Sequence, residues 1–237
     1  LCMGLYFNPN NKKSIKDISS SIYVDKTGLI EKLNKILCTN DNCIAVSHAR
    51  RFGKSQAANL IEAYYSVGCD SKDIFSKYEL AQADDFEKHL NKYNVIHIDV
   101  SSFSDYAGAD VVESIIQALI DDFQDSFPDI EYDVPLHRII YKIYQRTKNR
   151  FVIIVDEWDC VIRNYADQPE LVHKYMQFLH SLFKSMEATE FLALGYVTGI
   201  LPIKKINDES ALNNFRERTM MDSKNIARYY GFTEEEV

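Results

Sequence analysis

The sequence lacks the features that mark several common classes of protein. Its five cysteines form no C-x-x-C pair, which argues against a zinc knuckle or a dithiol redox centre. The longest apolar runs, Phe151 to Val155 and Phe191 to Leu194, are far shorter than a membrane-spanning helix. No positively charged segment followed by an apolar one opens the chain, so no signal peptide is indicated. We therefore expect a cytoplasmic protein with reduced thiols.

An excess of positive charge is also absent. The 237 residues contain 27 Lys and Arg against 35 Asp and Glu, which gives a formal net charge of -8. Proteins that bind nucleic acid mainly through the phosphate backbone need a dense basic surface, so this class is disfavoured. At 46% hydrophobic residues, the chain has enough apolar material for a sizeable globular core.

Strand-like and helix-like segments alternate along the chain. Four short runs are rich in β-branched or aromatic residues and are followed by polar residues or glycine, as buried parallel strands usually are. They are Cys43 to Ser47, Val95 to Val100, Phe151 to Val155, and Phe191 to Thr198. Amphipathic helices are expected between them, at about residues 109–126, 136–150 and 169–186. The alternation predicts an α/β fold with a mostly parallel sheet and helices on both faces.

A phosphate-binding loop is predicted between the first strand and a helix at residues 54–65. The connection reads Arg50-Arg51-Phe52-Gly53-Lys54-Ser55. Such a loop directs backbone N–H groups and the positive end of a helix at phosphate oxygens. The residues expected to contact the nucleotide are Ala49, Arg50, Arg51, Phe52, Gly53, Lys54, Ser55 and Gln56.

Three residues of this loop have separate expected roles. Gly53 lets the backbone come close to the phosphates, Lys54 contacts the β- and γ-phosphates, and Ser55 offers its hydroxyl to Mg²⁺. The full pattern has another glycine five residues before Gly53, where this chain has His48. The loop is therefore an incomplete match, and a chance Gly-Lys-Ser at a helix start is the alternative interpretation.

A second half of the site follows the third strand. Asp156 is expected to bind Mg²⁺, and Glu157 to orient and polarise the attacking water. Two solvated acids at a strand end are the alternative, but the order of the two motifs along the chain favours an ATP site. Thr198, at the end of the fourth strand, is a candidate sensor of the γ-phosphate, although Thr-Gly pairs also end strands for reasons of turn geometry.

Nearly the whole chain resembles a bacterial AAA-ATPase-like family, often fused to a C-terminal PD-(D/E)XK nuclease-like domain. The resemblance rests on Met3-Gly4-Leu5-Tyr6-Phe7-Asn8-Pro9, Tyr23-Val24-Asp25-Lys26-Thr27 with Leu29-Ile30, Arg50 to Ser55, Asp156-Glu157, Thr198-Gly199, Leu212-Asn213-Asn214, and Tyr230-Gly231-Phe232-Thr233-Glu234-Glu235-Glu236-Val237. The family usually has Arg-Pro where this chain has His48-Ala49, so the missing first glycine is a family trait and the His-Ala pair is this chain's own departure.

The resemblance implies a P-loop NTPase three-layer sandwich of the type with an additional strand and a catalytic glutamate. It also implies that Tyr23 to Lys26 lies near the nucleotide; an exposed pair at a helix entry, capped by Asp25 or Thr27, is the alternative. The expected divisions are an N-terminal extension packing on the nucleotide site at 1–42, an ATPase core at 43–222, and the start of a helical lid or C-terminal region at 223–237.

The end of the chain predicts a continuation. Thr233 with Glu236 three residues later reads as a capping box that opens a helix, yet the sequence ends at Val237. We therefore expect a fragment of a longer protein whose C-terminal part carries the effector activity. An ATP-driven switch for that part is the first hypothesis, and a nucleotide-binding scaffold with little turnover is the second.

Other charged residues leave further alternatives open. Asp156, Glu157 and Asp159 could form a metal-dependent nuclease site, although the spacing does not favour one. Arg216, Arg218 and Arg228, placed after the last expected strand, are candidates for a lid arginine. Arg138, Lys142 and Arg146 form a basic stripe that could bind nucleic acid or a partner, although solvation of an outer helix face is the usual explanation.

Overall fold

The computed structural model describes residues 4–12, 15–16, 26–47, 54–203 and 212–219. Its centre is a sheet of five parallel strands in the order β2-β3-β4-β1-β5. The strands are β1 Cys43–Ser47, β2 Asn94–Asp99, β3 Phe151–Asp156, β4 Leu192–Gly199 and β5 Arg216–Thr219. The predicted α/β fold class is confirmed, and β4 separates β1 from β3, as the additional-strand type requires.

The four predicted strands lie within one residue of the observed ones, but β5 was not predicted. Within the described part of the chain it is an edge strand, paired with β1 in parallel. Its sequence, Arg-Glu-Arg-Thr, alternates charged residues with no apolar side chain, so it lacks the pattern of a buried strand.

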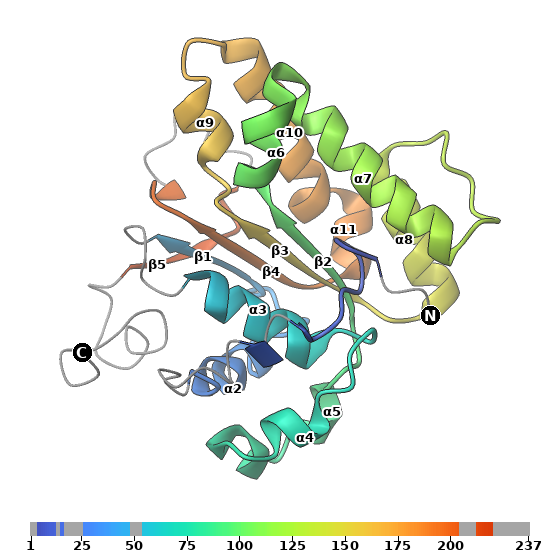
Figure 1. Cartoon of the computed structure of the whole chain (residues 1–237), viewed down its shortest axis with the longest axis vertical. Coiled ribbons are helices and arrows are strands. Elements are labelled where there is room, and N and C mark those ends of the chain that lie inside the picture. The colour runs from blue at the N-terminus through green and yellow to red at the C-terminus, as the bar shows by residue number, and fades with distance from the viewer. Residues whose placement is uncertain (1–3, 13–14, 17–25, 48–53, 204–211, 220–237) are drawn as a thin grey trace.

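Helices cover both faces of the sheet (Figure 1). One layer contains α2 Gly28–Asn34, α3 Lys54–Tyr65, α4 Lys72–Phe75, α5 Phe86–His89 and the 3₁₀ helix Glu79–Gln82. The other contains α6 Val100–Ala107, the 3₁₀ helix Gly108–Asp110, α7 Val111–Ser126, α8 Leu136–Thr147, α9 Cys160–Asn164, α10 Pro169–Lys184 and α11 Met186–Phe191. The chain is a three-layer sandwich.

Alternation along the central strands divides the apolar core between the two layers. On β3, Phe151, Ile153 and Val155 pack with the layer that contains α7. Val152 and Ile154 point the other way and pack with α3. All six residues of β3 are buried, which explains why the strand reads as one continuous apolar run that ends in an acid.

The N-terminal segment lies along the free edge of β2. Phe7 forms an antiparallel bridge with Ile96, and the Asn8 side-chain oxygen accepts a hydrogen bond from the Val95 N–H at 2.7 Å. Phe7 is fully buried in the core. The segment therefore covers backbone groups that an exposed edge strand would leave unpaired.

Helix α2 packs against α3 rather than standing free in solvent. Leu29, Ile30 and Leu33 are buried in the same core cluster as α3. Lys26 at its entry is 8% exposed, so the expectation of an exposed pair is wrong for this residue. Thr27 occupies the N-cap position without a side-chain capping bond. Because residues 17–25 lie outside the described part, packing of the 1–42 segment on the nucleotide site stays a prediction.

Gly68 is required by the close approach of the N-terminal segment. A Cβ at this position would lie 2.3 Å from the Asn8 carbonyl oxygen, which is a backbone atom and cannot rotate away. We expect Gly68→Ala to lower the free energy of unfolding by about 1–3 kcal/mol, the usual cost of overpacking. Urea denaturation measures it, with Gln124→Ala on the exposed face of α7 as the control. Equal stability of Gly68→Ala and wild type would contradict this packing.

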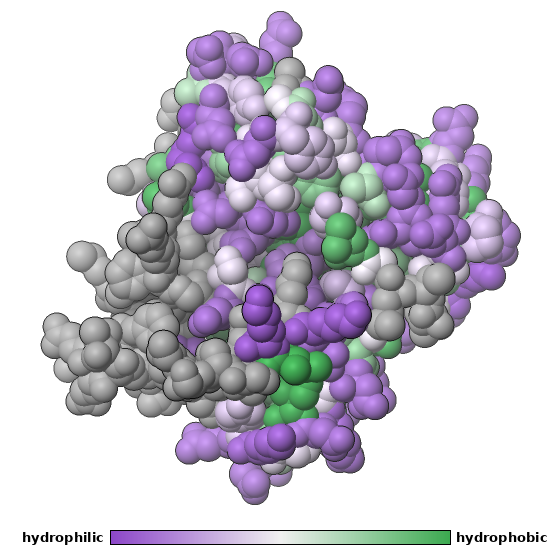
Figure 2. Space-filling model, viewed as in Figure 1, coloured by the Kyte–Doolittle hydropathy of each residue, from purple (hydrophilic) through white to green (hydrophobic). Residues whose placement is uncertain are grey.

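The described surface is mainly hydrophilic on the face shown in Figure 2, with apolar residues in small separate spots. No helix among the described residues is long and apolar enough to cross a bilayer. The described cysteines, Cys38, Cys43, Cys69 and Cys160, form no disulfide. Burial raises the pKa of the Cys43 and Cys69 thiols to about 12, so both are inert near neutral pH.

Candidate functional site

The carboxyl edge of the sheet brings the separate motifs together. Strand β1 ends at Ser47, and α3 begins at Lys54. Asp156 ends β3, and Thr198 lies near the end of β4, which runs between β1 and β3. In this topology the carboxyl ends of parallel strands form the usual ligand-binding edge of an α/β sheet.

Asp156 is the centre of the hydrogen bonds at this edge. The Ser55 hydroxyl, in the first turn of α3, donates to Asp156 Oδ2 at 2.8 Å. The Thr198 hydroxyl donates to Asp156 Oδ1, and the Glu157 N–H lies 3.1 Å from the same oxygen. Asp156 is only 5% exposed. The carboxylate is therefore held by two segments that lie far apart in the sequence and by the backbone of the next residue.

Thr198 supports Asp156 directly. Its side chain is fully buried, and its hydroxyl is the partner of the Asp156 carboxylate described above. Its backbone carbonyl accepts the Trp158 N–H at 2.9 Å, which joins the ends of β3 and β4. The role of Thr198 as a γ-phosphate sensor stays a prediction, because the described contacts are with protein groups.

Glu157 has an unusual backbone conformation. Its φ of 52° lies in the left-handed region, which non-glycine residues rarely adopt and which is often found at functional sites. The conformation turns the chain sharply after β3. One Glu157 carboxylate oxygen lies 3.1 Å from the Arg163 guanidinium, and both side chains are about one-fifth exposed. Glu157 thus stands at the edge of the site, within reach of solvent.

Asp159 belongs to the scaffold of the site. It is fully buried, and its carboxylate accepts the Leu201 N–H at 2.9 Å and the Arg163 Nε–H at 2.8 Å. The described residues contain no cluster of three His, Cys, Asp or Glu side chains suited to a metal. The alternative of a three-carboxylate nuclease site is therefore disfavoured, because the Asp159 carboxylate is bonded within the protein.

Several predicted site residues cannot be placed. Ala49, Arg50, Arg51, Phe52 and Gly53 lie outside the described residues, as does Arg228, and of Lys54 only the backbone is described. Ser55 and Gln56 are exposed at the start of α3. The nucleotide contacts of the loop therefore stay predictions, while Ser55, Asp156, Glu157 and Thr198 share one edge as expected.

The oxygen atoms at this edge fit a hard cation. Mg²⁺ prefers oxygen ligands and usually keeps several waters, so one hydroxyl and one carboxylate suffice beside phosphate oxygens. The Ser55 hydroxyl and the Asp156 carboxylate provide such a pair, joined by the 2.8 Å hydrogen bond. No histidine or thiol contacts either group among the described contacts, so the donor set suits magnesium rather than zinc.

Arg163 is the residue that the sequence reasoning missed. It lies on α9 and bridges two acids, with Nε on Asp159 and Nη2 on Glu157. Its spacing of four residues from Asp159, on a short helix after the acidic motif, is a signal that could have found it. The arrangement fixes a glutamate beside the predicted magnesium ligand through a bridging guanidinium.

Two of the three arginines expected after the last strand lie within a strand instead. Arg216 and Arg218 lie in β5, and Arg216 pairs with Asp41, just before β1. Arg216 therefore sits at the amino edge of the sheet, away from Asp156, and is not a lid arginine. The side chain of Arg218 is not among those described.

The basic stripe on α8 is neutralised within the protein. Lys142 and Arg146 each lie 2.6 Å from a carboxylate, those of Glu131 and Asp129 respectively. Arg138 Nε lies 3.6 Å from a Glu187 oxygen. Paired cations give little net field to attract phosphates, so this helix face is explained by solvation and ion pairing rather than by nucleic-acid binding.

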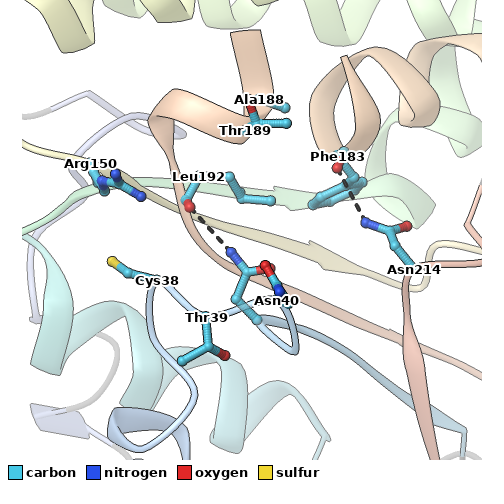
Figure 3. A pocket seen from close by; sticks show the side chains of 10 residues that line it. Cys38, Thr39, Asn40, Arg150, Phe183, Ala188, Thr189, Leu192 and Asn214 are labelled. Atoms are coloured by element: carbon cyan, nitrogen blue, oxygen red, sulfur yellow. Dashed lines mark hydrogen bonds between the residues drawn. The ribbon is translucent and has the colours of Figure 1, made fainter. Parts of the chain in front are cut away.

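A polar cavity of about 250 Å³ opens at the opposite edge of the sheet (Figure 3). It lies between the segment before β1, the start of β4 and the residues before β5. Asn42 donates to the Leu192 carbonyl and Asn214 to the Phe183 carbonyl, both at 3.2 Å. These residues precede the strands, whereas Asp156 ends one, so the cavity is separate from the site above.

Comparison with known proteins assigns the chain to a family. No curated protein matches it. A family model described as "Predicted AAA-ATPase" matches residues 12–207, which include both strand ends of the site and α3. Because the match covers most of the sequence, the chain belongs to the AAA-ATPase-like family, and the family supports an ATP-binding module.

Proposed function

We propose that this protein binds ATP with magnesium at the carboxyl edge of β1, β3 and β4 and hydrolyses it. The observation that carries the proposal is the 2.8 Å hydrogen bond between Ser55 and Asp156. It joins the start of the helix after the phosphate loop to the end of the acidic strand. P-loop NTPases hold magnesium with this pair of residue types.

Each residue at the edge has a proposed task. Ser55 and Asp156 hold the Mg²⁺, which supplies charge to neutralise the phosphates. Lys54 binds the β- and γ-phosphate oxygens, and the loop from Ala49 to Gln56 encloses the phosphate chain. Glu157 orients the attacking water and accepts its proton, and Thr198 keeps Asp156 in place.

We further propose that the nucleotide state is passed on to the rest of the protein that contains this module. The end of β4 is bonded both to Asp156, through Thr198, and to Asp159, through the backbone of the residues that follow. A change at the phosphates would thus reach the segment after Leu201. The family resemblance makes a C-terminal effector domain, in some members nuclease-like, the natural recipient.

A second candidate is a nucleotide-binding scaffold with little turnover. The observation in its favour is His48-Ala49, which stands where related sequences usually have Arg-Pro. The change removes a cation near the phosphates and a stiffening proline, which would slow chemistry more than binding. The rate of phosphate release from ATP in the presence of Mg²⁺ distinguishes the two candidates. An ATPase would release phosphate faster as wild type than as Glu157→Gln, whereas a scaffold would release it at the same rate in both forms.

The magnesium assignment is tested with Ser55→Ala. Losing a hydroxyl ligand of the Mg²⁺ should weaken Mg·ATP binding by about tenfold or more, since even groups that only support metal ligands typically contribute about 10- to 100-fold to metal affinity. Binding of ATP in EDTA should change by less than about twofold. Isothermal titration calorimetry of the same variant with and without Mg²⁺ measures the difference.

Ser181→Ala is the matched control for this experiment. Its hydroxyl donates to the Phe178 carbonyl within α10, away from the site. Both forms of ATP should bind this variant like wild type. If Ser55→Ala weakens binding equally with Mg²⁺ and with EDTA, Ser55 is not the magnesium ligand.

A further inference from the structure

Arg163 connects two acids that would otherwise be independent. Its Nε lies 2.8 Å from Asp159 Oδ2, and its Nη2 lies 3.1 Å from Glu157 Oε2. The arginine is 21% exposed, Glu157 is 22% exposed and Asp159 is fully buried. Because these side chains are partly buried, their contacts are screened less than those of a fully exposed ion pair.

Asp159 is a rigid support for this arginine. Besides Arg163, it accepts the Leu201 N–H at 2.9 Å and the Ile200 N–H at 3.2 Å. These two residues directly follow Gly199, where a Cβ would lie 2.6 Å from Asp159 Oδ1. The buried carboxylate is therefore packed tightly against the end of β4 and cannot move without disturbing that segment.

The backbone also limits where the Glu157 carboxylate can go. Its left-handed conformation sets the direction of the side chain, and a glutamate still has three rotatable bonds that must be fixed for it to act on a water. The planar guanidinium of Arg163 offers one N–H to each acid and is well suited to hold two carboxylates at a fixed separation. An amine on a flexible stem reproduces this geometry poorly.

We propose that Arg163 is a positioning residue that holds the Glu157 carboxylate in place for ATP hydrolysis, supported by Asp159 and the end of β4. The inference rests on the proposed function. Arg163 contacts no phosphate in this role and transfers no proton, so it affects the chemical step only through Glu157. Its contribution should appear in kcat and not in the affinity for ATP.

Arg163→Ala is the first test. With the full chain and Mg·ATP, we expect kcat to fall by about tenfold to a hundredfold, the effect of a small misplacement of a catalytic group. The dissociation constant of Mg·ATP should stay within about twofold of wild type. Arg163→Lys should recover part of the rate. Arg146→Ala is the control, since this arginine lies on α8, away from the site, and pairs with Asp129.

A double-mutant cycle separates positioning from a merely structural role. If Arg163 acts through Glu157, then Arg163→Ala should cause no further loss of kcat in a Glu157→Gln background. If Arg163→Ala does not fold, Arg163→Gln keeps most of the side chain and takes its place in the same cycle. Thermal unfolding of each variant shows which one is usable.

The remaining outcomes overturn the inference. Equal losses of kcat in both backgrounds mean that Arg163 acts independently of Glu157. An unchanged kcat, or a faster one, means that the ion pair does not position Glu157 for catalysis. When wild type hydrolyses ATP faster than Glu157→Gln, these results remove only this inference. When wild type releases no phosphate, the proposed hydrolysis fails and this inference fails with it.

Discussion

Replacing Glu157 by Gln is expected to lower the rate of ATP hydrolysis by about 10²–10⁴-fold, the usual contribution of a general base. The substitution keeps the size of the side chain and can still accept a hydrogen bond from Arg163, but it removes the group that takes the proton from water. The structure places Glu157 directly after Asp156, with its N–H 3.1 Å from Asp156 Oδ1 and its backbone turned into the left-handed region.

Glu157→Gln should keep its affinity for ATP while its rate of hydrolysis falls. Glu157 is not among the residues proposed to hold phosphate or magnesium, so the dissociation constant of Mg·ATP should remain within about twofold of wild type. Single-turnover phosphate release together with calorimetry measures both quantities. Glu170→Gln on the exposed first turn of α10 is the matched control. Wild-type turnover in Glu157→Gln would exclude Glu157 as the base and favour the nucleotide-binding scaffold.

The core strands could be predicted because buried strands consist of continuous apolar residues. Residues 151–155 read as one apolar run, since β3 is covered on both faces. β5 has no such apolar run, because this edge strand of alternating Arg and Glu has the composition of a loop. The helix predicted from Pro169 to about Met186 ends at Lys184, and the short helix α11 that follows was not predicted. The Ser185 hydroxyl caps α11 by accepting the Ala188 N–H at 3.1 Å.

The candidate site could also be predicted only in part from the sequence. Ser55 and Asp156 could be predicted to meet because each follows a local motif and the topology of a parallel sheet places the motifs at one edge. The contacts of Asp159 could not, because its partners at residues 200 and 201 are more than forty residues away. Burial of a carboxylate in tertiary structure changes its role from a candidate ligand to a support, and no local pattern encodes that change.

The second large effect is expected for Lys54→Ala. Lys54 begins α3 directly after the phosphate loop, and its ammonium is proposed to bind the β- and γ-phosphates. Charge-assisted hydrogen bonds of this kind contribute about 1.5–3 kcal/mol, so the affinity for ATP should fall by about 10- to 100-fold. Turnover should fall as well, because the same contacts stabilise the charge that develops in phosphoryl transfer.

Lys174→Ala provides the comparison for this variant. It removes a lysine that is about half exposed and pairs with Glu113 between α10 and α7, so it changes the net charge equally without touching the site. Any general effect of charge on the attraction of ATP appears in both variants. A loss of ATP affinity in Lys54→Ala beyond that in Lys174→Ala therefore reports on the phosphate loop.

The central claim is that ATP binds at the loop between β1 and α3. The most direct measurement is the dissociation constant of labelled ATP for wild type, Lys54→Ala and Lys174→Ala at equal Mg²⁺ and ionic strength. The account predicts that Lys54→Ala alone loses affinity, by at least about tenfold. If Lys54→Ala binds ATP as tightly as wild type, the nucleotide site lies elsewhere and the assignment is wrong.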